Sequence, residues 1–261
     1  MKFRKITVLL AASALSLGLA FSTAGPAAAS CGGASDCPCA TGTCIWAGWG
    51  VTGQDLTSTG TGKEYTSISG EFTVPAVKGS AGNVAFWYGL GGVNTALEQT
   101  GVAVKIVHGQ PVYQGFWELT PSKPVFYTKT VRPGDFMAAL VNYSSSPSST
   151  GGTYRMFLRD VTRGWSEDQV IPARSHLGTT SRDAAEAIVE NVQTYASKSP
   201  NPGPLPDFGT IRMDNIAVDN SYGWTQFNYG QSLIEWTLGT GKVYISPLQR
   251  AGDFTVTWEH S

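Results

Sequence analysis

Three segments decide the fold of this chain: NVAFWYG (residues 83–89), VAVKIV (102–107) and VYQGFWEL (112–119). Each is rich in β-branched and aromatic residues and is bounded by Gly, Pro or Asn, which is typical of a short strand. The same pattern recurs on both sides, in EFTVPAV (71–77), DFMAALVNY (135–143), TYRMFLRDV (153–161), KVYISPL (242–248) and DFTVTWEH (253–260). So many short strands predict an all-β fold built as a sandwich of two sheets.

One segment conflicts with this interpretation. RDAAEAIVENVQTYASK (182–198) is rich in Ala and Glu, with Asp183 placed as a helix N-cap. Intrinsic propensity alone predicts a helix here. The residues alone do not decide whether this segment is a strand or a helix.

The composition is that of a secreted β-rich protein. Charged residues make up 14% of the 261 positions, below the roughly 25% of an average soluble chain. Lys2, Arg4 and Lys5 precede an apolar run, and Ala27–Ala29 offers small residues to a signal peptidase. We therefore expect residues 1–29 to be a signal peptide cleaved near Ala29, with the protein secreted and not held in a membrane.

Removing that leader changes the charge balance. It takes away three basic residues and no acidic ones, so 15 Lys and Arg stand against 19 Asp and Glu, a net charge of −4. A mildly acidic chain lacks the excess of positive charge that is typical of nucleic-acid-binding proteins. We expect a monomer without a nucleic-acid partner.

All four cysteines lie between positions 31 and 44, in CGGASDCPCATGTC. In an oxidising compartment this spacing predicts two local disulfides, and a Cys37–Cys39 bond is disfavoured by its single intervening residue. The other two pairings stay open, and a zinc knuckle is the rival interpretation. We expect residues 30–44 to form a Cys-rich segment ahead of a sandwich domain at 45–261; the disulfide candidates are Cys31, Cys37, Cys39 and Cys44.

Most catalytic signatures are absent from the sequence. It has no GxSxG, HExxH, P-loop or dinucleotide-binding glycine pattern, and no DTG or DSG string of an aspartic peptidase. We therefore expect neither a metal nor a cofactor. What remains is a set of carboxylates and amides among aromatic residues, namely Glu98, Gln99, Glu118, Glu186 and Glu190.

Seven sequence blocks, in order, resemble the glutamic peptidases, the eqolisin family. They are ISGEFTVPAV (68–77), WYGLGG (87–92), LEQTGV (97–102), YQGFWELTP (113–121), RPGD (132–135), AEAIVE (185–190) and DFGTIRMDN (207–215). The resemblance begins at WAG (46–48) and covers most of the chain after the cysteines. It identifies the protein as a secreted, bacterial-type member of that family.

The resemblance implies a jelly-roll sandwich of two antiparallel sheets with a catalytic Gln and Glu on its concave face. It assigns these roles to Gln99 and Glu190, with Trp87, Glu118 and Glu186 supporting the substrate cleft. It also implies that 185–190 is a strand, so that Glu186, Ile188 and Glu190 would share one face by the period of two. The sequence departs from the family at four positions: Ala187, Gly91, Leu119 and Thr120.

The function implied is an acid endopeptidase acting on proteins or peptides. Glu190 would take a proton from a water that attacks the peptide carbonyl and return it to the leaving amine, while Gln99 donates to the oxyanion. Two alternatives remain. One is a jelly-roll glycoside hydrolase using Glu118 and Glu190, with Trp87 and Trp117 as sugar platforms; the other is a non-catalytic binding module.

Overall fold

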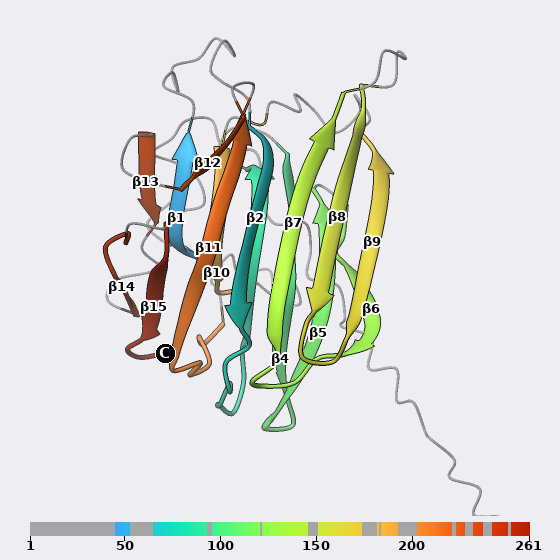
Figure 1. Cartoon of the computed structure of the whole chain (residues 1–261). Helices are drawn as coiled ribbons and strands as arrows, with labels where there is room; N and C mark the ends of the chain where they lie inside the picture. Colours follow the sequence, from blue (N-terminus) through green and yellow to red (C-terminus); the bar gives the residue numbers. More distant parts are fainter. Residues whose placement is uncertain are drawn as a thin grey trace, which may run out of the picture.

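A computed structural model describes residues 45–52, 65–92, 96–120, 122–145, 151–173, 182, 184–192, 203–220, 223–227, 232–236, 242–249 and 252–261. All regular structure in these residues is β-strand, and the strands form two antiparallel sheets that lie face to face (Figure 1). This confirms the all-β sandwich predicted from the sequence. The expected signal peptide and the four cysteines, with their expected disulfides, lie outside the described residues.

The seven-stranded sheet carries most of the segments that resemble the family. Its order is β13-β1-β10-β3-β4-β5-β6, and neighbouring strands pair antiparallel. The bounds are β1 Trp46–Thr52, β3 Asn83–Gly91, β4 Leu97–Val107, β5 Gln110–Leu119, β6 Val125–Thr130, β10 Ala184–Glu190 and β13 Ser232–Trp236.

The eight-stranded sheet covers one face of the first. Its order is β14-β15-β11-β2-β7-β8-β9, with β12 pairing β11 off this path. The bounds are β2 Tyr65–Thr73, β7 Phe136–Ser144, β8 Thr153–Asp160, β9 Trp165–Pro172, β11 Thr210–Asn220, β12 Gly223–Gln226, β14 Val243–Ile245 and β15 Phe254–Trp258.

The segment with helical propensity is a strand where the structure describes it. β10 lies between β1 and β3, and every one of its residues is buried. A helix could not pair with both neighbours, so tertiary context overrides the Ala and Glu propensities. The helix expected from propensity at 182–198 is therefore wrong for Ala184–Glu190.

The main core lies between the two sheets. Phe86 and Tyr88 of β3 point into it, and Phe72 of β2 meets both rings, with centroids 6.4 and 6.2 Å away. The backbone at Gly70 lies so close to Tyr88 that an added Cβ would lie 2.4 Å from its ring. The two sheets therefore pack closely against each other where β2 faces β3.

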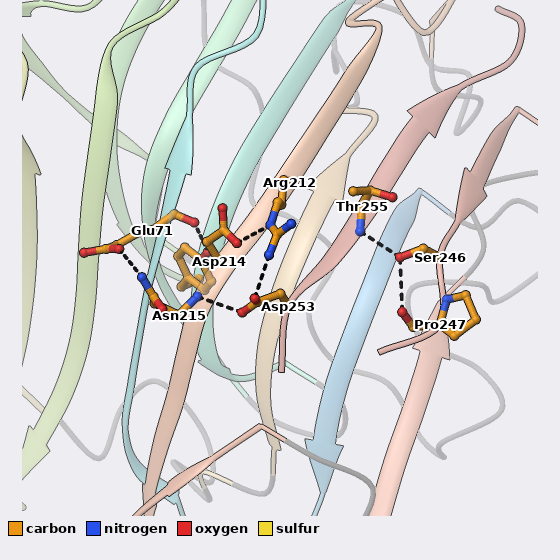
Figure 2. Close-up of polar contacts among 9 residues, drawn as sticks. Glu71, Arg212, Asp214, Asn215, Ser246, Pro247, Asp253 and Thr255 are labelled. Carbon is orange, nitrogen blue, oxygen red and sulfur yellow. Dashed lines mark hydrogen bonds and ion pairs between the residues drawn. The ribbon is translucent and has the colours of Figure 1, made fainter. Parts of the chain in front are cut away.

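A polar network fixes an irregularity in β11 on the opposite sheet (Figure 2). Asn215 adopts a positive φ of 50° where the pairing of β11 with β2 shifts register. Its backbone N–H donates to Asp253, and its side-chain amide donates to Glu71. Arg212 donates to the same Asp253 and to Asp214. These bonds join the bulge to the chain just before β15, away from the face that carries the candidate site.

Among the described residues, no helix is long and apolar enough to cross a membrane.

Candidate active site

Alternate residues of the seven-stranded sheet point to opposite faces. One face packs into the main core; the other carries a separate apolar cluster that includes Trp46, Trp87, Phe116 and Ile188. We call this second surface the outer face. Strand pairing gives it three rows: Glu190, Ala85, Ala103 and Gln114; Ile188, Trp87, Gly101 and Phe116; Glu186, Gly89, Gln99 and Glu118.

The rows bring together every site residue expected from the sequence. Glu186, Ile188 and Glu190 share the outer face, as the period of two predicted. Two polar rows therefore flank one apolar row. Of the five carboxyl and amide residues in these rows, Glu186, Glu190, Gln99 and Glu118 are each at most 5% exposed, and Gln114 is half-buried.

Glu190 is held by Trp87. The indole N–H of Trp87 donates to Glu190 Oε2 at 2.9 Å, inside the protein. Burial raises the pKa of the Glu190 carboxyl from its usual 4.5 to about 7, and the Trp87 hydrogen bond acts in the opposite direction. The carboxyl can therefore exchange a proton near neutral pH, which suits a group that must act as both base and acid.

Gln99 is held by Glu118. The two residues are directly opposite on β4 and β5, and Gln99 Nε2 donates to Glu118 Oε2 at 2.8 Å. An amide nitrogen carries two hydrogens, so this bond uses only one. Gln99 Oε1 is buried and has no hydrogen-bond partner among the described residues. Such an atom calls for a functional explanation, because buried acceptors are nearly always satisfied.

Trp46 also lies beside the candidate site, although it was not among the site residues predicted from the sequence. It lies directly opposite Glu190 on β1, and its ring meets Trp87 edge-on with centroids 5.0 Å apart. Together the two indoles form an apolar wall beside the carboxyl. The WAG block that begins at Trp46 was a signal for this residue, but no spacing rule connects it to position 190.

The departures from the family pattern leave the carboxyl and amide of the outer face untouched. Ala187 and Leu119 belong to the main core, on the other side of the sheet. Trp49 pairs with Ala187 and packs on the same core. Gly91 has a φ of 82°, a conformation that a side chain disfavours. Thr120 uses its hydroxyl to accept the backbone N–H of Leu97 at the start of β4.

One part of the glycoside hydrolase alternative is wrong. Trp117 pairs with Thr100 and packs against the main core, whereas Trp87 points to the outer face. The two tryptophans therefore cannot form one sugar platform.

No group of three or more His, Cys, Asp or Glu side chains in the described part of the chain is arranged to hold a metal ion.

Comparison with known proteins agrees with this fold. Residues 45–258 match the sequence profile described as the Peptidase A4 family. Aspergillopepsin-2 of Aspergillus niger is 28% identical over 178 residues, which is 59% of this chain and 60% of that protein. The alignment thus spans about three fifths of the length of this curated relative.

Three solved structures share the fold. Scytalido-glutamic peptidase, determined with a peptide-based transition-state analogue, superposes with a TM-score of 0.66 at 18% identity, covering 83% of this chain and 98% of that one. SCP-B, a member of the eqolisin family in complex with the tripeptide Ala-Ile-His, gives 0.63 at 17% identity, with the same coverage of both chains. Aspergilloglutamic peptidase of Aspergillus niger gives 0.51 at 21% identity, covering 68% and 99%. Because the family profile spans most of the sequence, this chain belongs to the peptidase A4 family.

Proposed function

We propose that this protein is a secreted endopeptidase that hydrolyses peptide bonds with Glu190 and Gln99 and needs no metal. The observation that carries the proposal is a buried carboxyl and a buried amide on one face, each oriented by a single neighbour. Family membership supports hydrolysis of peptides, and the apolar leader at residues 1–29 supports export.

Glu190 supplies the proton chemistry. As a carboxylate it removes a proton from a water molecule, whose oxygen then attacks the carbonyl carbon of the peptide bond. The same carboxyl then returns the proton to the leaving nitrogen as the carbon–nitrogen bond breaks. The Trp87 hydrogen bond keeps Glu190 Oε2 in place through both steps.

Gln99 supplies the electrostatic stabilisation. Its second amide hydrogen donates to the carbonyl oxygen as that oxygen becomes negative, while the first remains on Glu118. Glu118 is thus a positioning residue that keeps the donor side of the amide toward the substrate.

The pairing register gives the spacing of the proposed residues on the outer face. Glu190 and Gln99 lie two strands and four residues apart, so a regular antiparallel lattice separates their Cα atoms by about 17 Å. Glu186 lies in the same row as Gln99, about 10 Å away on the same lattice, so the roles of Glu190 and Glu186 have to be compared directly. Glu118 lies one strand further, and its carboxyl would be roughly 11 Å from that of Glu190, beyond the ~6.5–9.5 Å of an inverting glycosidase.

We expect the optimum at weakly acidic to neutral pH. A carboxyl that acts as base and then acid works best near its own pKa, and burial places that of Glu190 at about 7. This is higher than the acidic optimum expected of a glutamate with its usual pKa of 4.5.

The experiment is a peptidase assay of the secreted protein on denatured protein and on an internally quenched peptide. Wild-type protein should cleave both, and Glu190→Gln should abolish turnover while keeping the Trp87 hydrogen bond. Glu186→Gln is the comparison on the same strand and face, and it should retain activity. If Glu186→Gln were the inactive variant, or if the protein cleaved β-glucan but no peptide, the proposal would be wrong.

A further inference from the structure

A second set of charged residues lies behind the outer face, inside the sandwich. Glu98 precedes Gln99 and pairs with Leu90 and Leu119, both of which belong to the main core. Its side chain therefore points inward, and the residue is 1% exposed. A carboxyl this deeply buried needs a compensating charge.

Arg182, just before β10, supplies a buried cation at the same end of the sandwich. It is 6% exposed, and its Nε donates to the backbone oxygen of Tyr65 at 3.1 Å. Its own backbone oxygen accepts from the N–H of Tyr65 at 2.9 Å. The guanidinium lies over the ring of Tyr143, 3.6 Å from its centroid. Arg182 is thus tied to two strands of the eight-stranded sheet.

Tyr154 of β8 interacts with both charges. It is fully buried, and its ring is 5.2 Å from that of Tyr143, on which Arg182 rests. Burial and the charge of Glu98 raise the pKa of its phenol, and Arg182 opposes that change. Glu98 and Arg182 therefore both lie within interaction range of this one phenol.

We propose that Glu98 and Arg182 form a charge-compensating pair that positions the catalytic strand β4 from behind. Arg182 neutralises Glu98, and the anchored Glu98 holds its neighbour Gln99 at the depth at which Gln99 reaches Glu118. The pair also joins β4 to the residue that leads into β10, so it links the strands of Gln99 and Glu190. This role for the pair rests on the proposed function of Gln99.

Glu186 is the rival partner for Arg182. Burial and the charge of Glu186 raise the pKa of Tyr65 to about 12, so this carboxyl also lies near the residue that Arg182 contacts. It belongs to the outer face, however, whereas Glu98 belongs to the interior that contains Tyr143 and Tyr154. The experiment therefore has to separate the two carboxylates.

The first test is a double-mutant cycle read by urea unfolding, which requires no activity. Glu98→Leu and Arg182→Met should each lower the unfolding midpoint, and the double variant should regain at least half of the summed loss, because neither charge is left alone. Milder variants, Glu98→Gln and Arg182→Lys, serve if the first pair does not fold. Additive losses, or coupling of Arg182 to Glu186→Gln and not to Glu98, would overturn the proposal.

The exposed pair Arg155 and Asp168 is the matched control. These residues belong to β8 and β9, are 46% and 42% exposed in their side chains, and pair at 2.7 Å. Arg155→Met and Asp168→Leu should show little coupling, because exposed ion pairs contribute little to stability. Strong coupling at this surface pair would mean that the cycle does not report on burial.

The second test concerns positioning. In the folded Glu98→Leu/Arg182→Met variant, kcat should fall roughly 10- to 100-fold while KM stays within about threefold, since a small misplacement of Gln99 affects the transition state more than substrate binding. The single variant Arg182→Lys, which keeps the positive charge, should have a kcat between those of the wild type and the double variant. An unchanged kcat would leave only a structural role and refute the positioning claim. A fully active Gln99→Ala would instead refute the proposed function, while the unfolding cycle would still decide whether the pair exists.

Discussion

Glu190→Gln should make the protein more stable at alkaline pH although it abolishes catalysis. Glu190 is 5% exposed, and its carboxyl accepts one hydrogen bond from Trp87 at 2.9 Å. Gln has nearly the same shape and can accept the same bond through its side-chain oxygen. The substitution therefore imitates the protonated form of Glu190 and removes only the buried negative charge.

The size of the effect follows from linkage. Burial raises the pKa of Glu190 from 4.5 in an unfolded chain to about 7 in the folded protein. The folded state thus holds a proton that the unfolded state releases between these values, so stability falls as pH rises through that window. Above pH 7 the full loss is present, and it amounts to about 3 kcal/mol. Below pH 4.5 both states are protonated and the loss vanishes.

The assay is thermal and urea unfolding of wild type and Glu190→Gln at pH 4 and pH 8. At pH 8 the variant should be more stable by about 3 kcal/mol, or on the order of 5–10 °C in melting temperature for a domain of this size. At pH 4 the two proteins should unfold together. Glu259→Gln, at an exposed position near the C-terminus, is the control substitution of the same chemical type.

Equal stability at pH 8 would refute the reasoning, because it would mean that Glu190 is as well solvated as a free carboxylate. The pH optimum near neutrality would then also fail, since both rest on the same buried charge. Greater stability of Glu190→Gln at pH 4 and pH 8 alike would point to improved packing in place of titration.

Four further outcomes test the site and one buried carboxyl outside it. Gln99→Ala should lower kcat/KM by about 10²–10³, measured with a quenched peptide, through loss of the oxyanion donor; a near-normal rate would remove Gln99 from the mechanism. Trp87→Phe should move the acidic limb of the kcat/KM profile to higher pH, because the lost N–H had favoured the charged form of Glu190; an unmoved limb would contradict this. Activity should survive EDTA, and full inhibition would require a metal mechanism. Asp160→Asn should stabilise the protein at pH 8 but not below about pH 4, since burial and the charge of Asp135 raise the pKa of Asp160; calorimetry showing no such difference would mean that Asp160 is solvated.

The fold and the shared face of the candidate residues could be predicted, because both follow from short-range patterns; the choice of those residues came from the family resemblance. Alternation of apolar residues predicted the strands, and the period of two placed Glu186 and Glu190 on one face. The same rule separates Glu98 from Gln99, and the structure places the two residues on opposite faces of β4.

The contacts that tune the site could not be predicted, because they join residues far apart in the chain. The Trp87–Glu190 hydrogen bond spans 103 positions, and the edge-on contact of Trp46 with Trp87 depends on β1 pairing with β10. The raised pKa of Glu190 follows from burial, which a local pattern does not reveal. The sequence predicted an acidic optimum, and the proposed role of a buried Glu190 leads us to expect one nearer neutral pH.

The residues of β10 explain why helix propensity failed at the strand that carries Glu186 and Glu190. A central strand that is buried on both faces usually contains β-branched residues, but this one alternates Ala185, Ala187 and Val189 toward the core with Glu186, Ile188 and Glu190 on the outer face. Small residues on the core side leave room for Trp49 and Tyr88, the direct neighbours of Ala187 on β1 and β3. Glu190 on the other side is required by the proposed chemistry and not by packing. The composition that predicts a helix therefore arises from two separate demands, one on each face of a strand.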